Sequence, residues 1–162
     1  MNLSKLLQPG KVSEETFQIL TPVFEGEVLC KQERYLEAEA KYLEALKDFP
    51  SGSGGRFLIY NKLGIVYEKM EQFEQAIAVY EKGAKEGSTT PFCYQHLACL
   101  CMDAGRLREA MRYCDQGRKC LKRARTTFFQ EIYFWLIFFR IERKIKRLLS
   151  DSGSDGARRQ QS

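Results

Sequence analysis

The fold is decided by residues 57–90, which read FLIYNKLGIVYEKMEQFEQAIAVYEKGAKEGSTT. Two sets of residues in this stretch recur every three or four positions: Leu63, Tyr67 and Met70, then Ala76, Val79 and Tyr80. This spacing puts each set on one face of a helix. The link between the two helices falls at residues 71–73, and so short a link allows nothing but a tight turn. The stretch therefore predicts two antiparallel helices.

The same arrangement occurs in three blocks of 34 residues. The copies span residues 19–52, 57–90 and 91–124, with turns predicted at 32–35, 71–73 and 104–107. Small residues recur where the paired helices would cross: Gly26, Gly64 and Ala98 in the first helices, and Ala38, Ala76 and Ala110 in the second. Because one helix pair cannot bury its apolar face alone, the copies are expected to stack on one another.

The pattern of residues within each copy resembles the tetratricopeptide repeat (TPR). The middle copy carries Tyr60, Leu63, Gly64, Tyr67, Phe73, Ala76 and Tyr80. The first keeps Gly26, Leu29, Tyr35, Ala38, Tyr42, Ala45 and Pro50, and the third keeps Tyr94, Leu97, Ala98, Gly105, Leu107 and Ala110. The resemblance implies an all-α fold: a right-handed α-α solenoid of three TPR helix pairs with a short N-terminal helix and a long C-terminal helix.

Breaker residues set the expected boundaries. We expect a flexible lead-in over residues 1–12, a TPR domain over 13–149 and a disordered tail over 150–162, which offers little to bury. Thr21 and Pro22 read as an N-cap followed by proline at the first helical position, so we expect a short helix at 13–20 and a break near Thr21. Thr127 can cap a last helix over 128–149.

A concave peptide-binding groove is implied by the resemblance, because the first helices of TPR proteins line such a face. Helical phasing assigns to it Val23, Phe24, Glu27 and Cys30, then Leu58, Asn61, Lys62, Ile65, Glu68 and Lys69, then Phe92, Gln95, His96, Cys99, Met102 and Asp103. Four of these are expected to be exposed apolar groups, namely Leu58, Ile65, Phe92 and Met102. Such groups are typical of a surface that recognises another protein's peptide or helix. The alternative is that the N-terminal segment or the last helix fills the groove.

One TPR subfamily, the chaperone-adaptor type, grips a terminal carboxylate with two Lys, two Asn and an Arg, because an anion of this kind needs several converging donors. The matching places in this chain hold Val23, Glu27, Lys62, Phe92 and His96. Only Lys62 could serve, and Glu27 would repel the carboxylate. The sequence therefore disfavours a carboxylate clamp.

The last predicted helix contains the most apolar run of the chain, YFWLIFF at residues 133–139. It is apolar on every side for about two turns, a pattern typical of a helix that is covered on more than one side. Even an apolar run of about a dozen residues makes only roughly 18 Å of helix, whereas a bilayer core is about 30 Å thick. A membrane span is not expected.

Beyond this run the helix becomes amphipathic, with a basic stripe of Arg140, Arg143, Lys144 and Arg147. Three interpretations stay open. The stripe is a solvated face, or the helix forms a symmetric homodimer through Phe134, Trp135, Phe138, Phe139 and Ile145, or the stripe and tail bind an anionic membrane surface or nucleic acid. Nucleic acid and membrane are not favoured, because no recognition motif is present and a stripe of four is modest.

Charge is distributed unevenly. The formal net charge is +5, but residues 1–117 sum to −3 and residues 118–162 to +8. No secretory signal is recognisable at the start, so we expect a cytoplasmic or nuclear location. Six cysteines lack the spacing of a zinc site, and Cys101 and Cys114 fall at places that the other copies fill with core residues.

Motifs of catalysis are not found: there is no glycine-rich phosphate loop, nucleophile elbow or zinc signature in the sequence. The single histidine, His96, has no partner that the sequence makes visible. No enzyme activity, cofactor or metal is therefore expected. The expected function is a non-enzymatic adaptor or scaffold that binds a partner protein.

Overall fold

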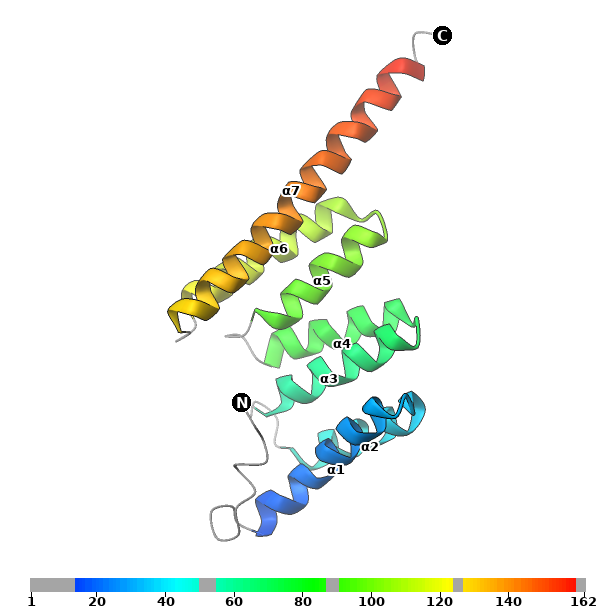
Figure 1. Ribbon diagram of the computed structural model, residues 1–162, viewed down its shortest axis with the longest axis vertical. Helices are drawn as coiled ribbons and strands as arrows, with labels where there is room; N and C mark the ends of the chain where they lie inside the picture. Colours follow the sequence, from blue (N-terminus) through cyan, green and yellow to red (C-terminus); the bar gives the residue numbers. More distant parts are fainter. Residues whose placement is uncertain (1–13, 50–54, 87–90, 124–126, 160–162) are drawn as a thin grey trace. The chain divides into compact units, whose positions relative to one another are not determined.

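Seven helices and no strand are formed by the residues that the computed structural model describes, 14–49, 55–86, 91–123 and 127–159 (Figure 1). The helices are α1 (Glu14–Lys31), α2 (Tyr35–Asp48), α3 (Arg56–Lys69), α4 (Phe73–Glu86), α5 (Phe92–Asp103), α6 (Leu107–Arg123) and α7 (Phe128–Arg159). The predicted all-α solenoid of helix pairs is confirmed. The chain divides into two compact units, Met1–Val79 and Tyr80–Ser162, with the boundary inside α4.

The three turns between paired helices share one geometry and fall where the sequence predicts them. At each turn the sixth residue donates its backbone N–H to the carbonyl of the first: Arg34 to Leu29 at 3.0 Å, Gln72 to Tyr67 at 2.9 Å and Arg106 to Cys101 at 2.8 Å. The residue before the donor is left-handed in each case, with φ of 60° at Glu33, 59° at Glu71 and 72° at Gly105. This is a Schellman motif, which ends one helix and reverses the chain within three residues.

The small residues predicted at the helix crossings are all buried, in the order Gly26, Ala38, Gly64, Ala76, Ala98 and Ala110. In the first unit, α2 packs against both α1 and α3. The ring of the buried Tyr42 lies directly over Gly26, where a Cβ atom would be only 2.8 Å from its Cε1. A larger residue at position 26 would hold α1 and α2 apart.

The expected short helix at 13–20 and the break near Thr21 are wrong, because α1 is continuous from Glu14 to Lys31 with Pro22 inside it. Pro22 is buried, and the Thr21 hydroxyl donates to the Phe17 carbonyl oxygen at 2.8 Å, one turn earlier. Proline at position 22 removes the backbone N–H that would meet the Gln18 carbonyl, and the helix runs through it nonetheless. The lead-in predicted over 1–12 lies outside the described residues.

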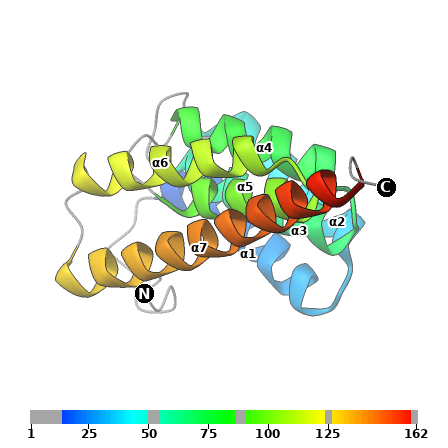
Figure 2. The same ribbon diagram turned by 90° about the horizontal axis from the view of Figure 1, so that it is seen from above.

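In the second unit α7 packs along α6 and also contacts α5, as Figures 1 and 2 both show. Its inner face consists of four buried residues at helical spacing, Phe134, Phe138, Ile141 and Ile145. Gly117 of α6 leaves room for the Phe138 ring. Thr127 caps the helix as predicted: the Gln130 N–H donates to its Oγ1 at 3.4 Å and its own N–H donates to Gln130 Oε1 at 3.2 Å, which is a capping box.

The end of α7 differs from the prediction. The sequence predicts a helix end at Leu149 and a disordered tail, whereas the backbone stays helical to Arg159. Once a helix is nucleated, each further residue adds one backbone hydrogen bond without a new nucleation cost. No helix in the described parts of the chain is long and apolar enough to cross a membrane.

Candidate functional site

The predicted groove residues of the first unit lie on α1 and α3. Leu58 is exposed, at 52%, and Val23, Asn61 and Ile65 are half-buried. The side-chain oxygen of Asn61 is buried and has no hydrogen-bond partner among the described residues. A buried acceptor of this kind costs about 1–3 kcal/mol until a donor reaches it. This stripe of α3 therefore offers an exposed apolar side chain, Leu58, on the same helix as a buried acceptor that no described donor satisfies.

Lys62 and Glu27 bridge the two helices of this face. Lys62 Nζ lies 2.6 Å from Glu27 Oε1, and the two side chains are 41% and 21% exposed. A half-exposed pair contributes little to stability, typically below about 1 kcal/mol. Its larger effect is on recognition, because the cation that could have met a partner's carboxylate is already neutralised by Glu27.

The predicted groove residues of the second unit lie on α5. Phe92 is exposed, and Gln95, His96 and Cys99 are half-buried. The prediction that Met102 is exposed is wrong, since it is only 8% exposed. The reason is that α5 packs against both α6 and α7, so more than one of its faces is covered.

The last helix reaches part of this face. The ring of Phe134 meets the ring of Phe92 edge-on, with centroids 4.7 Å apart and planes at 89°. His96 is stacked on Tyr80 with centroids 4.7 Å apart. The last helix therefore contacts Phe92, which stays 42% exposed, while Gln95 and Cys99 on the same face are half-buried.

The residues proposed for self-association divide into two groups. Phe134, Phe138 and Ile145 are buried inside the unit, so the prediction that they form a contact between copies is wrong. They lie on the one stripe of α7 that α5 and α6 cover. Trp135 and Phe139 are exposed and stack on each other, with centroids 5.4 Å apart. The basic stripe, Arg140, Arg143, Lys144 and Arg147, is exposed.

Comparison with known proteins agrees with the repeat pattern. Residues 18–85 match a family model described as tetratricopeptide repeat. Within residues 18–85 the chain is therefore similar to tetratricopeptide repeats. No curated protein matches it in sequence.

Solved TPR structures show how widely the fold is shared. The TPR domain of Sgt2 from Aspergillus fumigatus is 15% identical, with a TM-score of 0.64 over 88% of this chain and 83% of that one. The first TPR of Spaghetti (RPAP3), bound to the HSP90 peptide SRMEEVD, is 16% identical, with a TM-score of 0.62 over 82% and 93%. The type III secretion translocator chaperone SycD of Yersinia enterocolitica is 19% identical, with a TM-score of 0.64 over 85% and 96%. At these identities the likeness shows the fold.

Three buried thiols of the second unit are held in their protonated form. Burial raises the pKa of Cys93 and of Cys114 to about 12. Cys101 is also buried, as predicted, and its pKa is raised for the same reason. A thiol is a good nucleophile or metal ligand only as the thiolate. Among the described residues, no group of three or more His, Cys, Asp or Glu side chains could hold a metal ion.

Two tyrosine hydroxyls connect neighbouring helices. Tyr67 donates to Glu39 Oε1 at 2.6 Å, and Tyr113 donates to Glu81 Oε1 at 2.5 Å. Burial, followed by the hydrogen bond to the carboxylate, raises the pKa of each tyrosine to about 12. These contacts join residues about 30 positions apart in sequence, so the spacing of the repeat could not reveal them.

Proposed function

We propose that the chain is a non-enzymatic adaptor that binds a segment of a partner protein on the first helices of its TPR repeats. The observation that carries the proposal is the face of α1 and α3, where exposed Leu58 stands beside the unpartnered oxygen of Asn61. An apolar side chain of the partner would pack on Leu58 and Ile65.

The Glu27–Lys62 pair defines what this face selects. The HSP90 peptide bound by the RPAP3 domain, SRMEEVD, contains three acidic residues. On this chain such a peptide would have to compete with Glu27 for Lys62. We therefore expect the face to prefer an uncharged, partly apolar segment over an acidic one, and we expect no measurable binding of SRMEEVD.

The test uses two leucines of the same unit. Leu58→Asp places a charge on the proposed face, and Leu36→Asp places the same charge on α2, where Leu36 is also exposed. Proteins captured by wild-type chain and by each variant are identified by mass spectrometry, and the affinity of the main partner is measured. Leu58→Asp is expected to weaken binding at least about tenfold, the loss of about 1.4 kcal/mol, while Leu36→Asp leaves it unchanged. Equal binding by wild type and Leu58→Asp would reject this face as the binding site.

A further inference from the structure

A second surface lies on the side of α7 that faces away from α5 and the inner part of α6. Four apolar residues at helical spacing are exposed there: Ile132 at 41%, Trp135 at 54%, Leu136 at 47% and Phe139 at 49%. The inner row of the same helix, including Phe134 and Phe138, is buried. Scattered exposed apolar residues are ordinary, but a continuous stripe that includes Trp and Phe is typical of an interaction surface.

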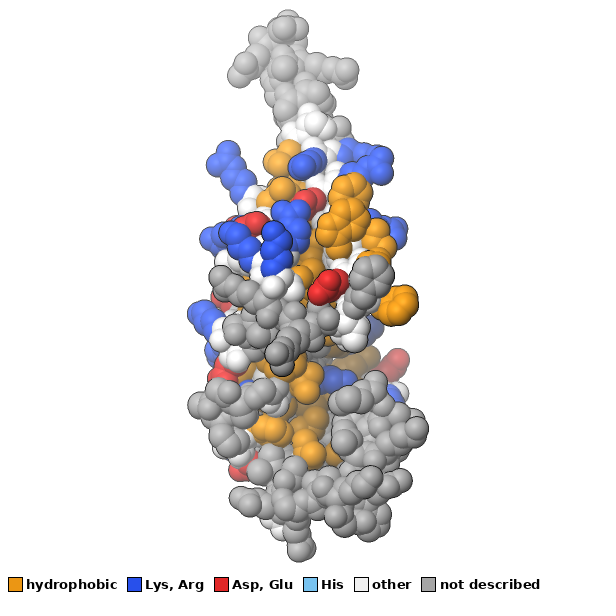
Figure 3. All heavy atoms as spheres, turned by 90° about the vertical axis from the view of Figure 1, so that its left-hand side faces the viewer, with side chains coloured by type: hydrophobic (Ala, Val, Ile, Leu, Met, Phe, Trp, Pro, Cys, Tyr) orange, Lys and Arg blue, Asp and Glu red, His pale blue; other side chains and the backbone are white. Residues whose placement is uncertain are grey.

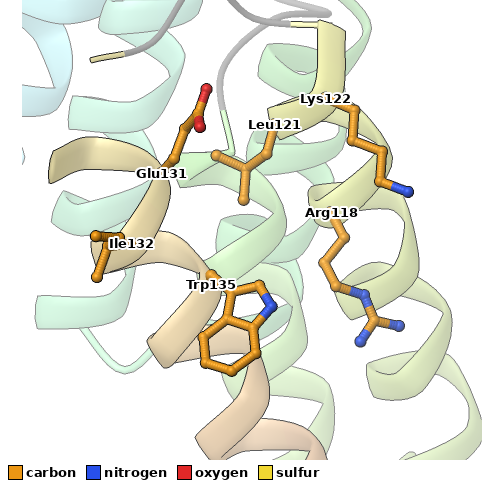
Figure 4. A pocket seen from close by; sticks show the side chains of 6 residues that line it. All are labelled: Arg118, Leu121, Lys122, Glu131, Ile132 and Trp135. Atoms are coloured by element: carbon orange, nitrogen blue, oxygen red, sulfur yellow. The ribbon is translucent and has the colours of Figure 1, made fainter. Parts of the chain in front are cut away.

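The stripe borders a cavity between α6 and α7 of about 460 Å³. Figure 4 shows the six residues that line it: Arg118, Leu121, Lys122, Glu131, Ile132 and Trp135. Leu121, Ile132 and Trp135 supply an apolar surface, and the cations of Arg118 and Lys122 lie along its α6 side. A cavity of this size falls in the range that accommodates a compact ligand or a protruding side chain.

The charge around this cavity is strongly positive. Helix α6 has six basic and two acidic residues, and α7 up to Ser150 has five basic and two acidic. The apolar stripe runs directly into Arg140, Arg143 and Arg147, all exposed. Figure 3 shows hydrophobic side chains in the upper part of the view with Lys and Arg side chains on either side. Electrostatic complementarity therefore calls for a negatively charged occupant.

Three kinds of occupant compete for such a surface. A second copy of the chain would bring the same positive α6–α7 face to a symmetric contact, so like charges would oppose each other. A membrane requires apolar groups that protrude from a convex face and enter the lipid, whereas here Ile132 and Trp135 form the walls of a concavity. An amphipathic helix of a protein fits both features, because it presents apolar side chains at i, i+3, i+4 and i+7 beside a charged flank.

We infer that the outer face of α6 and α7 binds an acidic amphipathic helix of a partner protein. One large apolar side chain of that helix enters the cavity between Leu121, Ile132 and Trp135. Its carboxylates meet Lys122 on one side and Arg140 and Arg143 farther along α7, whereas Arg118 is already paired with Glu142 at 2.5 Å. The inference is independent of the groove on α1 and α3, and either can fail without the other.

Trp135 makes the inference measurable, because it is the only tryptophan in the sequence and lines the cavity. The full chain is titrated with a synthetic peptide of about 20 residues that has Leu at helical spacing and Glu elsewhere, about 30 Å long as a helix. A control peptide has the same composition in an order that forms no apolar face. The expected result is a saturable blue shift of Trp135 emission with the first peptide alone, weakened by added salt.

Two lysines of α6 provide a matched pair of charge reversals. Lys122 lines the cavity, whereas Lys119 is outside it and pairs with Asp115 at 2.7 Å. Lys122→Glu is expected to weaken peptide binding about tenfold, and Lys119→Glu to change it less than about twofold, although both alter the net charge equally. Circular dichroism confirms that each variant is folded. Equal weakening by both variants would mean a diffuse electrostatic attraction and would overturn the inference.

The remaining outcomes would reject the proposed occupant or assign the surface to another one. Absence of any response up to about 100 µM of the acidic peptide, a level at which even weak specific contacts saturate, would reject the proposed occupant. A blue shift with vesicles of phosphatidylcholine and phosphatidylserine, but not with the peptide, would assign the surface to a membrane. A blue shift that grows with the concentration of the chain alone, together with a dimer mass in sedimentation, would assign it to a second copy.

Discussion

Gly117 is the residue on which the seating of α7 depends most directly. A Cβ atom at this position would lie 2.2 Å from Cζ and 2.7 Å from Cε1 of Phe138, closer than carbon atoms can approach. Phe138 is completely buried, so its ring has no free space to move into. Nothing in the repeat pattern singles out this glycine, because the ring that requires it, that of Phe138, is 21 residues away in the sequence.

Substitution of Gly117 tests this contact, because two effects oppose each other. Alanine favours a helix over glycine by about 1 kcal/mol, while overpacking a core costs about 1–3 kcal/mol. We expect the clash to win, so that Gly117→Ala lowers the free energy of unfolding in urea. Gln116→Ala, at the exposed neighbouring position, is the control and should change it by less than about 0.5 kcal/mol. A more stable Gly117→Ala protein would contradict the packing described for Phe138.

The hydroxyl of Tyr67 gives a pH-dependent prediction. Its pKa is raised to about 12 in the folded chain, above the value near 10 of an unfolded tyrosine. Between these values the unfolded chain releases the phenol proton first, so this contribution to stability is complete below about pH 10 and is lost as the pH rises towards 12. Near neutral pH, Tyr67→Phe should cost about 1 kcal/mol. The cost should shrink when unfolding is measured at increasing alkaline pH, and a cost that stays constant would argue against the Tyr67–Glu39 bond.

At the scale of elements, the three Schellman turns place unlike residues in the same left-handed conformation. Gly105 adopts its positive φ without strain, whereas Glu33 and Glu71 hold a side chain there. A left-handed residue with a side chain is less stable than glycine by about 1–2 kcal/mol in the folded chain. Part of this difference is offset, because glycine loses more backbone freedom on folding.

Exchanging residues at two of these turns should shift stability in opposite directions. Gly105→Ala is expected to lower the free energy of unfolding by about 1 kcal/mol, and a clash is not the cause, since no atom lies within 4 Å of the added Cβ. Glu71→Gly is expected to raise it by about 0.5 kcal/mol. Chemical denaturation of the two variants checks both signs. The same sign for both would mean that contacts of the side chains, and not backbone conformation, dominate these turns.

The helices and turns could be predicted because they depend on local spacing. The small residues from Gly26 to Ala110, the Thr127 cap and the turns follow from helical periodicity and short-range chemistry. The predicted break near Thr21 was wrong, since the sequence does not distinguish a proline at the start of a helix from a proline inside one, as Pro22 is. The direction of a side chain on a helix that packs on two sides, such as Met102, depends on neighbours that the pattern does not specify.

The candidate sites were less predictable than the helices. Helical phasing assigned Lys62 to the predicted groove, but its ion pair with Glu27 joins two repeats. From the sequence, Glu27 was expected only to repel a partner's carboxylate. The cavity beside Trp135 arises from the angle between α6 and α7, and no motif marks it. Arg118 and Glu142 show the same limit: their ion pair at 2.5 Å links residues that no short-range rule connects.

For the whole molecule, α7 is part of the second unit and not an appendage. Its four buried residues each contribute about 1.5–3 kcal/mol by burial, so together they approach the total stability of a small domain, about 5–15 kcal/mol. Removing α7 is therefore expected to unfold the second unit as well.

Two truncations test this role. A chain that ends at Ser150 keeps all four buried residues, and we expect its thermal unfolding, followed by circular dichroism, to match that of the full chain within about 2 °C. A chain that ends at Arg123 lacks α7, and it should lose part of its helical signal and unfold over a broad range. Cooperative unfolding of the shorter chain at an unchanged temperature would show that α5 and α6 fold without α7.

The positions of the cysteines allow the opening of the second unit to be measured by thiol labelling. Cys93, Cys101, Cys114 and Cys120 are buried, and all four lie in this unit, while Cys99 of the same unit and Cys30 of the first unit are half-exposed. A reagent that reacts with thiols can reach the four only when the helices around them separate. The rate at which these four thiols are labelled, compared with the rate for Cys30, therefore measures how often α5, α6 and α7 separate, and no probe has to be added to the chain.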